Sequence, residues 1–228
     1  MIVFVAGMPR SGSTYAFNVA RDASMRRGTL YQQASPDFRT ALDAAGRVDH
    51  VLIKAHEADE LGIALAHQSA MRVVCTVRRP EDAVASWMET FGSSEMDAIE
   101  NIRRWLRFYA QLRGVALTVR YETLDAYPTL AAKRIGRHLF EDFSWREARV
   151  IARRHSKASV KERTDQLERD AVGVQDIGFT WYDKQTFFHR RHVSSLVAKR
   201  AEERIDADQV ARIRTALAAE IAASGLST

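Results

Sequence analysis

The chain has 228 residues, a hydrophobic fraction of 46% and a formal net charge of +5. This length can bury one sizeable core with an appended segment, and the composition is that of a globular protein. Lysine and arginine are spread along the chain instead of forming a stripe or tail. The positive charge therefore does not indicate nucleic-acid binding, and it suits a polyanionic small molecule.

Other classes are excluded by what the sequence lacks. Its single cysteine, Cys75, rules out an internal disulfide framework and a cysteine zinc site. Cys75 lies in the apolar run 73–77 and is expected to be a buried strand residue. The first apolar run is too short for a signal peptide, and no run approaches the ~20 residues of a membrane span. We expect a cytoplasmic protein, and the sequence does not predict its oligomeric state.

Short apolar, β-branched runs alternate with helical patterns through about residue 140. The strands are predicted over 2–6, 30–32, 48–54, 72–77 and 115–120. The helices are predicted over 13–26, 37–45, 59–67, 80–91, 96–112, 128–139, 145–154 and 207–223. Such alternation predicts an α/β fold with a central parallel β-sheet flanked by helices, in which the ligand lies past the carboxyl ends of the strands.

A glycine-containing turn follows the first strand. Gly7, four further residues, Gly12 and Thr14 match the P-loop pattern G-x-x-x-x-G-K-[ST], but Ser13 replaces its lysine. The backbone N–H groups of such a turn and the positive end of the helix dipole bind phosphate. The missing lysine argues against hydrolysis of a nucleoside triphosphate, while Arg10 supplies a cation within the turn. We predict a P-loop fold that binds an anion shorter than a triphosphate.

Residues 10–15, RSGSTY, resemble a motif of the sulfotransferases that use 3′-phosphoadenosine 5′-phosphosulfate (PAPS). Their 5′-phosphosulfate loop reads [KR]-x-G-[TS]-[TS], often followed by an aromatic residue. The resemblance implies that Arg10 touches the bridging oxygen and the sulfuryl group and that Tyr15 stacks near the adenine. It also implies a 5′-phosphate site formed by Ser11, Gly12, Ser13 and Thr14.

A second anion site is predicted at the end of the strand over 72–77. Arg78 leaves this strand, and Ser86 follows eight residues later on the next helix. An arginine fork binds phosphate well. The same family has a similar frame, R-x-P-x-D-x-x-x-S, at its 3′-phosphate site, so the resemblance implies that role for Arg78 and Ser86. We expect Asp82 to orient Arg78 or to cap the turn.

Lys54 ends the strand predicted over 48–54, and His56 and Glu57 follow it. A neutral histidine can accept the proton that an acceptor hydroxyl or amine loses during transfer. Cytosolic sulfotransferases carry a similar K-x-H, which implies that His56 is the base and that Lys54 offsets charge on the transferring group. Their motif continues with an apolar residue and proline, whereas Glu57 follows here, so Glu57 is the alternative base.

Two later segments also resemble the family. Residues 120–124, RYETL, look like its R-Y-E-x-L and are expected to be mainly structural. An aromatic and basic patch over 179–192 is expected either to be structural or to cover the cofactor. In the second case Arg190 or Arg191 supplies a cation for the 3′-phosphate, and Trp181 or Phe188 supplies an adenine wall. His189 and His192 lack further ligands at metal spacing, so no metal site is predicted.

These patterns predict one sulfotransferase domain over 1–228. It would consist of an α/β core over 1–156, a flexible segment over 157–192 that covers acceptor and cofactor, and C-terminal helices over 193–228. The predicted reaction transfers the sulfuryl group from PAPS to a hydroxyl or amine of a small molecule or glycan, and leaves adenosine 3′,5′-bisphosphate. The alternatives are a nucleotide or small-molecule kinase and a non-catalytic nucleotide-binding module.

Overall fold

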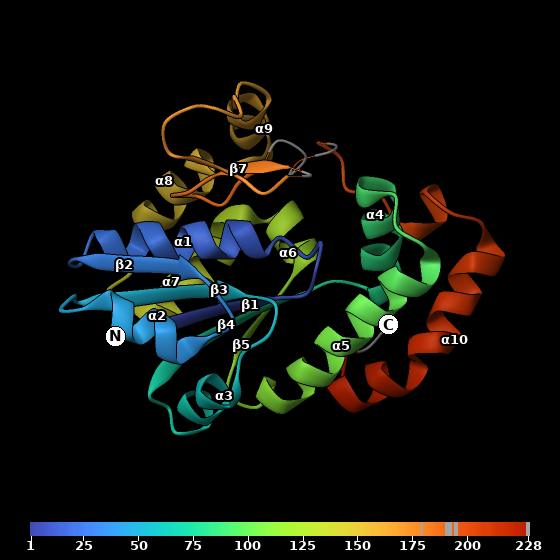
Figure 1. The fold of residues 1–228 in the computed structure, drawn as a ribbon, viewed down its shortest axis with the longest axis horizontal. Helices are drawn as coiled ribbons and strands as arrows, with labels where there is room; N and C mark the ends of the chain where they lie inside the picture. The colour runs from blue at the N-terminus through green and yellow to red at the C-terminus, as the bar shows by residue number, and fades with distance from the viewer. Residues whose placement is uncertain (179, 190–192, 194–195, 227–228) are drawn as a thin grey trace.

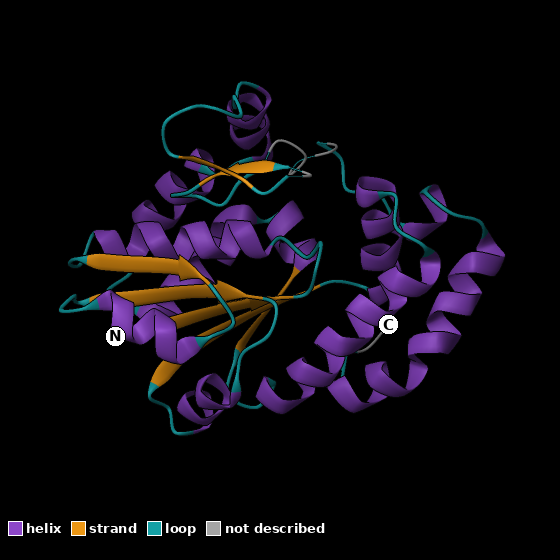
Figure 2. Ribbon diagram, in the orientation of Figure 1, coloured by secondary structure: helices purple, strands orange, loops and turns teal. Residues whose placement is uncertain are grey.

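A five-stranded parallel sheet with the order β2-β3-β1-β4-β5 forms the centre of the molecule (Figures 1 and 2). The computed structural model describes residues 1–178, 180–189, 193 and 196–226. The strands are β1 (Ile2–Gly7), β2 (Leu30–Ala34), β3 (His50–Ala55), β4 (Met71–Val77) and β5 (Leu117–Arg120). Since all neighbours pair in parallel, the carboxyl ends of the strands lie at one edge of the sheet.

The helices begin where the sequence carries capping residues or proline. Aspartate or serine side chains cap six of the described helices, and Pro80 and Pro128 open two others. The α-helices are α1 (Ser13–Met25), α2 (Phe38–Ala45), α3 (Glu60–His67), α4 (Pro80–Phe91), α5 (Glu95–Leu112), α6 (Tyr121–Ala126), α7 (Pro128–Leu139), α8 (Trp145–Arg154), α9 (Lys157–Asp165) and α10 (Ala207–Ser224). In the described part of the chain, none of the helices has the length and apolar character needed to cross a membrane.

Each face of the sheet has its own hydrophobic core, because alternate strand residues point to opposite sides. Phe4, Ile53 and Val73 face a core that includes residues of α2, α5 and α10. Val5 and Val74 face the other core, which α1, α7 and α8 complete. The result is a three-layer α/β/α arrangement, and the predicted fold class is confirmed.

The chain after residue 156 contains more regular structure than the sequence pattern predicts. Helix α9 is followed by a two-stranded antiparallel sheet of β6 (Val174–Asp176) and β7 (Trp181–Asp183). A 3₁₀ turn, η1 (Ala201–Glu203), precedes α10, which packs against α4 and α5. These strands are too short and too polar to show a clear alternating pattern in the sequence.

Two predicted boundaries differ near β5. The strand begins at Leu117 instead of residue 115, and the helix α6 begins directly after Arg120. No helix was predicted over 121–126, and residues 120–124 were expected only to be mainly structural. A helix of six residues is too short to give a clear helical period, and here it brings Tyr121 and Leu124 to the carboxyl edge of the sheet.

Candidate functional site

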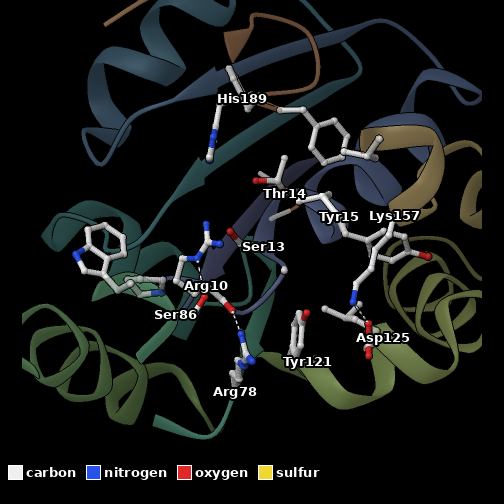
Figure 3. Close-up of a pocket in the computed structure, with 18 of the residues that line it drawn as sticks. Arg10, Ser13, Thr14, Tyr15, Arg78, Ser86, Tyr121, Asp125, Lys157 and His189 are labelled. Atoms are coloured by element: carbon white, nitrogen blue, oxygen red, sulfur yellow. Dashed lines mark hydrogen bonds and ion pairs between the residues drawn. The ribbon is translucent and has the colours of Figure 1, made fainter. Parts of the chain in front are cut away.

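A cavity of about 330 Å³ lies at the carboxyl edge of the sheet (Figure 3). The turn between β1 and α1 forms part of its wall, together with the ends of β3 and β4 and with α6. Later parts of the chain line it as well, including residues 187–189, 197–198 and 204. The cavity therefore lies where parallel α/β sheets hold their ligands.

Two glycines allow the turn after β1 to pack closely. A Cβ atom on Gly7 would lie 2.1 Å from the Ser13 Cβ atom and 2.6 Å from the Thr76 hydroxyl. Gly12 has a φ of 83° and would place a Cβ atom 2.9 Å from Leu124. Both positions therefore exclude larger residues. Arg10 also has a positive φ, 64°, and such a conformation in a non-glycine residue is typical of functional turns.

The first turn of α1 faces the cavity without a side-chain cap. Gly12 is the N-cap residue and offers no capping hydrogen bond, while Ser13 and Thr14 line the cavity. The N–H groups at a helix start have no partners within the helix, so they bind an anion readily. This geometry suits the phosphate site predicted for residues 12–14.

Ser11 has a different environment from its neighbours. Its hydroxyl donates to the Met8 carbonyl oxygen at 2.6 Å and lies 2.6 Å from the Thr76 hydroxyl. Ser11 is fully buried and lies outside the cavity lining. Its side chain therefore stabilises the turn from behind, and the predicted phosphate contact is left to the residues that follow it.

Arg10, Arg78 and Ser86 are joined by hydrogen bonds. Arg10 Nε donates to the Ser86 hydroxyl at 3.2 Å, and Arg78 Nη1 donates to the Arg10 carbonyl oxygen at 3.3 Å (Figure 3). Within the described chain, neither guanidinium forms an ion pair with a carboxylate. Burial, with a smaller effect of Arg78, lowers the pKa of Arg10 to about 10. The three residues thus form a positively charged wall, and no ion pair with a carboxylate of the described chain neutralises its two guanidinium groups.

His56 lies just after β3 with a fixed orientation. Its Nδ1 is 2.6 Å from the Gly7 carbonyl oxygen, which can only accept a hydrogen bond, so we assign the proton to Nδ1. In the neutral ring Nε2 is then free to accept a proton. The ring is exposed at its edge, yet the surrounding protein displaces much of the water that would solvate a charged imidazole. This desolvation and, to a smaller extent, the nearby charge of Lys54 lower the pKa of His56 to about 4. The imidazole is therefore neutral at neutral pH.

Lys54 and Glu57 differ in their relation to the cavity. Lys54 lines it, with its ammonium 5.9 Å from the centre of the Phe187 ring, and burial lowers the pKa of Lys54 to about 8. Glu57 forms an ion pair with Arg104 of α5 and lies outside the lining. Of the two candidate bases, His56 is thus the one that faces the cavity.

Aromatic side chains form another part of the wall. Tyr15, Tyr121, Phe187 and Phe188 line the cavity, and the Tyr15 hydroxyl donates to the Pro128 carbonyl oxygen at 2.7 Å. Trp181 lies outside the lining, and its indole N–H donates to the Leu167 carbonyl oxygen at 2.8 Å. Phe188 is therefore the better placed of the two residues predicted as an adenine wall.

The remaining predicted residues divide into two groups. Arg190 and Arg191 lie outside the described residues, as does His192. Asp82 does not orient Arg78: its carboxylate accepts from the Ala201 N–H at 2.7 Å and from Arg200 at 3.3 Å. The prediction that Asp82 orients Arg78 is therefore wrong, and this residue anchors the C-terminal segment on α4.

Several lining residues were missed by sequence reasoning. Tyr121 was treated as structural, yet its ring lies 4.3 Å from the Arg78 guanidinium carbon and faces the cavity. Asp125 and Lys157 form an ion pair in the wall (Figure 3), and His155 and Arg204 complete it. The R-Y-E-x-L motif could have indicated Tyr121, but the others carry no local sequence signal.

The scan against family models and the search of curated proteins found no match. Solved structures do match. One is retinol dehydratase in complex with androsterone and inactive cofactor PAP, at 12% identity and a TM-score of 0.66, covering 100% of this chain and 82% of that chain. Another is mouse sulfotransferase SULT7A1 complexed with PAP, at 14% identity and a TM-score of 0.70, covering 97% of this chain and 84% of that one.

A further structure of retinol dehydratase, in a complex with retinol and PAP, matches at 12% identity. Its TM-score is 0.65, and the match covers 100% of this chain and 83% of that chain. Since these identities are low, the likeness establishes the fold: the chain has the fold of these sulfotransferase-like structures. What it binds and does must be argued from its own residues.

Proposed function

We propose that this protein is a PAPS-dependent sulfotransferase. The observation that carries the proposal is the arrangement of three features in one cavity: an uncapped helix start at Gly12, a cationic wall of Arg10, Arg78 and Ser86, and the imidazole of His56. A donor with phosphate at both its 3′ and 5′ positions matches two separate anion sites. The shared fold supports this reading, because the matched structures are complexed with PAP.

The residues fit the donor in charge as well as in position. The N–H groups of the first turn of α1 would hold the 5′-phosphate, and Arg78 with Ser86 would hold the 3′-phosphate. Tyr15 and Phe188 would flank the adenine. The carboxylates that would normally compensate Arg10 and Arg78 are missing from the described residues, so a bound dianion would supply the missing charge.

The proposed reaction is a direct displacement at sulfur. The acceptor oxygen or nitrogen forms a bond to sulfur while the bond from sulfur to the bridging oxygen breaks, and that electron pair stays on the 5′-phosphate. The acceptor proton passes to Nε2 of His56, which the Gly7 carbonyl holds in position through Nδ1. Arg10 and Lys54 offset the negative charge on the transferring group and the leaving phosphate.

The alternative functions are less well supported. A kinase would need the lysine that Ser13 replaces and a carboxylate for magnesium near the phosphate turn. Strands β3, β4 and β5 instead carry Lys54, Arg78 and Arg120 at or just after their ends. The carboxylate in the cavity lining, Asp125, forms an ion pair with Lys157. A non-catalytic nucleotide-binding module would have no use for a neutral histidine held toward the cavity. We also propose that the acceptor is a small molecule, by analogy with the androsterone and retinol complexes, and that the protein is cytoplasmic.

Titration calorimetry with adenosine 3′,5′-bisphosphate, adenosine 5′-phosphate and ATP tests the proposal. We expect the bisphosphate to bind at least about tenfold more tightly than either competitor, because only it can occupy both anion sites. The protein should then be incubated with labelled PAPS and a panel of small hydroxylated and aminated acceptors and glycans. We expect it to transfer the label to at least one of them. Preference for ATP would contradict the proposal and favour the kinase.

A further inference from the structure

Helices α7 and α8 expose basic side chains on the side that faces away from the sheet. The two helices pack against each other and complete the same hydrophobic core as α1. Their exposed positions include 130, 134 and 137 on α7 and 146, 149, 150 and 153 on α8. Such spacing places these side chains on one outward face of each helix. The basic residues of this surface, which we call the α7–α8 face, are the half-buried Lys133 and the exposed Arg134, Arg137, Arg146, Arg149 and Arg153.

Carboxylates compensate little of the positive charge of the α7–α8 face. None of its six basic residues forms an ion pair with a carboxylate of the described chain. Residues 128–154, all of which are described, contain three acidic residues. Asp142 and Glu147 accept hydrogen bonds from Arg27 at 3.1 and 3.0 Å, which leaves Glu141. Like charges at this spacing repel one another along a helix, so a partner with negative charge is favoured on this face.

Large apolar side chains lie among these cations. Trp145 is 52% exposed, Val150 43% and Leu130 40%. The Lys133 ammonium lies 5.6 Å from the centre of the Trp145 ring, so the apolar and basic groups share one surface across the two helices. Valine and leucine gain nothing from phosphate or sulfate groups, but they are stabilised when they enter a hydrocarbon layer. This combination favours a lipid surface over a nucleic acid or a sulfated glycan.

We propose that the α7–α8 face binds the anionic phospholipid surface of a membrane. Its arginines contact the headgroup phosphates, and Trp145, Val150 and Leu130 enter the boundary between headgroups and acyl chains. The two helices lie along the membrane surface, with their inner sides still packed on the sheet. The inference is independent of the proposed sulfuryl transfer, because the face lies outside the cavity lining.

Vesicle flotation tests the inference, with phosphatidylcholine vesicles that contain or lack phosphatidylserine. We expect the wild-type protein to bind the anionic vesicles at least about hundredfold more tightly at ~0.1 M salt, and to lose most of this preference at ~0.5 M salt. The triple variant Arg146→Gln, Arg149→Gln, Arg153→Gln should bind them about tenfold or more weakly, since each arginine near such a surface contributes up to about fivefold. Trp145→Ser should weaken binding by several-fold, because the ring no longer enters the boundary layer.

The matched control replaces three exposed arginines elsewhere in one variant, Arg39→Gln, Arg47→Gln, Arg113→Gln. Arg39 lies on α2 and Arg113 follows α5, and these helices complete the core on the opposite face of the sheet. This variant loses the same net charge, yet its binding to anionic vesicles should stay within about threefold of the wild type. Circular dichroism shows whether each variant is folded.

Three results would overturn the inference. One is a wild-type protein without preference for anionic vesicles; this comparison needs no substitution, so it decides even if a variant fails to fold. Another is an equal loss of binding in the two triple variants, which would trace the attraction to net charge alone. The third is tighter binding to heparin or duplex DNA than to anionic vesicles, with Trp145→Ser unchanged, which would assign the face to a soluble polyanion.

Discussion

The two halves of the cavity wall are held in very different ways. The sheet half is formed by the segments 7–14, 54–56 and 78 at the carboxyl ends of strands β1, β3 and β4, which contribute lining residues such as Arg10, Lys54 and Arg78. The covering half is formed by residues 174–178, 180–189, 193 and 196–204, which contribute lining residues such as Phe187, Phe188 and Arg204. Continuous parallel pairing and two hydrophobic cores fix the sheet half, whereas the strands of the covering half pair over only three residues each.

Individual side chains attach the covering half to the rest of the molecule. Asn18 Nδ2 donates to the Thr186 carbonyl oxygen at 2.8 Å, and Gln32 Nε2 donates to the Gln185 carbonyl oxygen at 2.8 Å. Asp82 anchors the part that carries Arg204. We infer that the sheet half holds the reacting groups in place and that the covering half adds contacts that select the ligand.

The largest expected effect comes from removing the base in the sheet half. His56→Ala should lower the rate of sulfuryl transfer by about hundredfold or more, because it removes the proton acceptor. Affinity for adenosine 3′,5′-bisphosphate should stay within a few-fold. Glu57→Gln is the matched control and should retain most activity, since Glu57 pairs with Arg104 outside the cavity. If Glu57→Gln abolished activity while His56→Ala retained it, Glu57 would be the base.

The same substitution in each half should cost very different amounts of stability. Gly7→Ala places a methyl group 2.1 Å from the Ser13 Cβ atom, and we expect it to lower the free energy of unfolding by about 3 kcal/mol. Gly173→Ala near the covering half has open space around it and a φ of 85°, so about 1 kcal/mol is expected for the strained backbone. Urea denaturation measures both, and equal losses would refute the contrast between the halves.

A smaller effect is expected in the pH dependence of the proposed reaction. Because the pKa of Lys54 is lowered to about 8, its charge is lost as the pH rises above 8, and kcat/KM should fall there by several-fold. The pKa of His56, lowered to about 4, keeps the base neutral between pH 8 and 6, so no acid limb should appear in that range.

Two lysine substitutions sharpen this test. Lys54→Arg should move the alkaline fall to higher pH, since arginine keeps its charge. Lys184→Arg alters an exposed lysine of the covering half and should leave the profile unchanged. An alkaline fall that persists in Lys54→Arg would show that another group titrates.

Much of the sheet half could be predicted from short stretches of sequence. The P-loop-like spacing of Gly7 and Gly12 indicated the phosphate turn, and the strand ends indicated Arg78 and Lys54. The choice between His56 and Glu57 was left open, because adjacent residues of an extended chain point to opposite sides and the sequence does not say which side meets the cavity. The contact of Glu57 with α5 decides this in the structure.

The sequence by itself determined the α/β fold class and the anion-binding turn, because strand period, glycine spacing and helix start are properties of neighbouring residues. Only the tertiary structure decided that Ser11 turns inward, that Phe188 rather than Trp181 lines the cavity, and that Asp82 anchors Ala201. Arg204 meets Arg78 only because α10 packs against α4 and α5 and brings the end of the chain back to the sheet. Contacts between residues so far apart depend on packing of whole elements, and no local pattern records them.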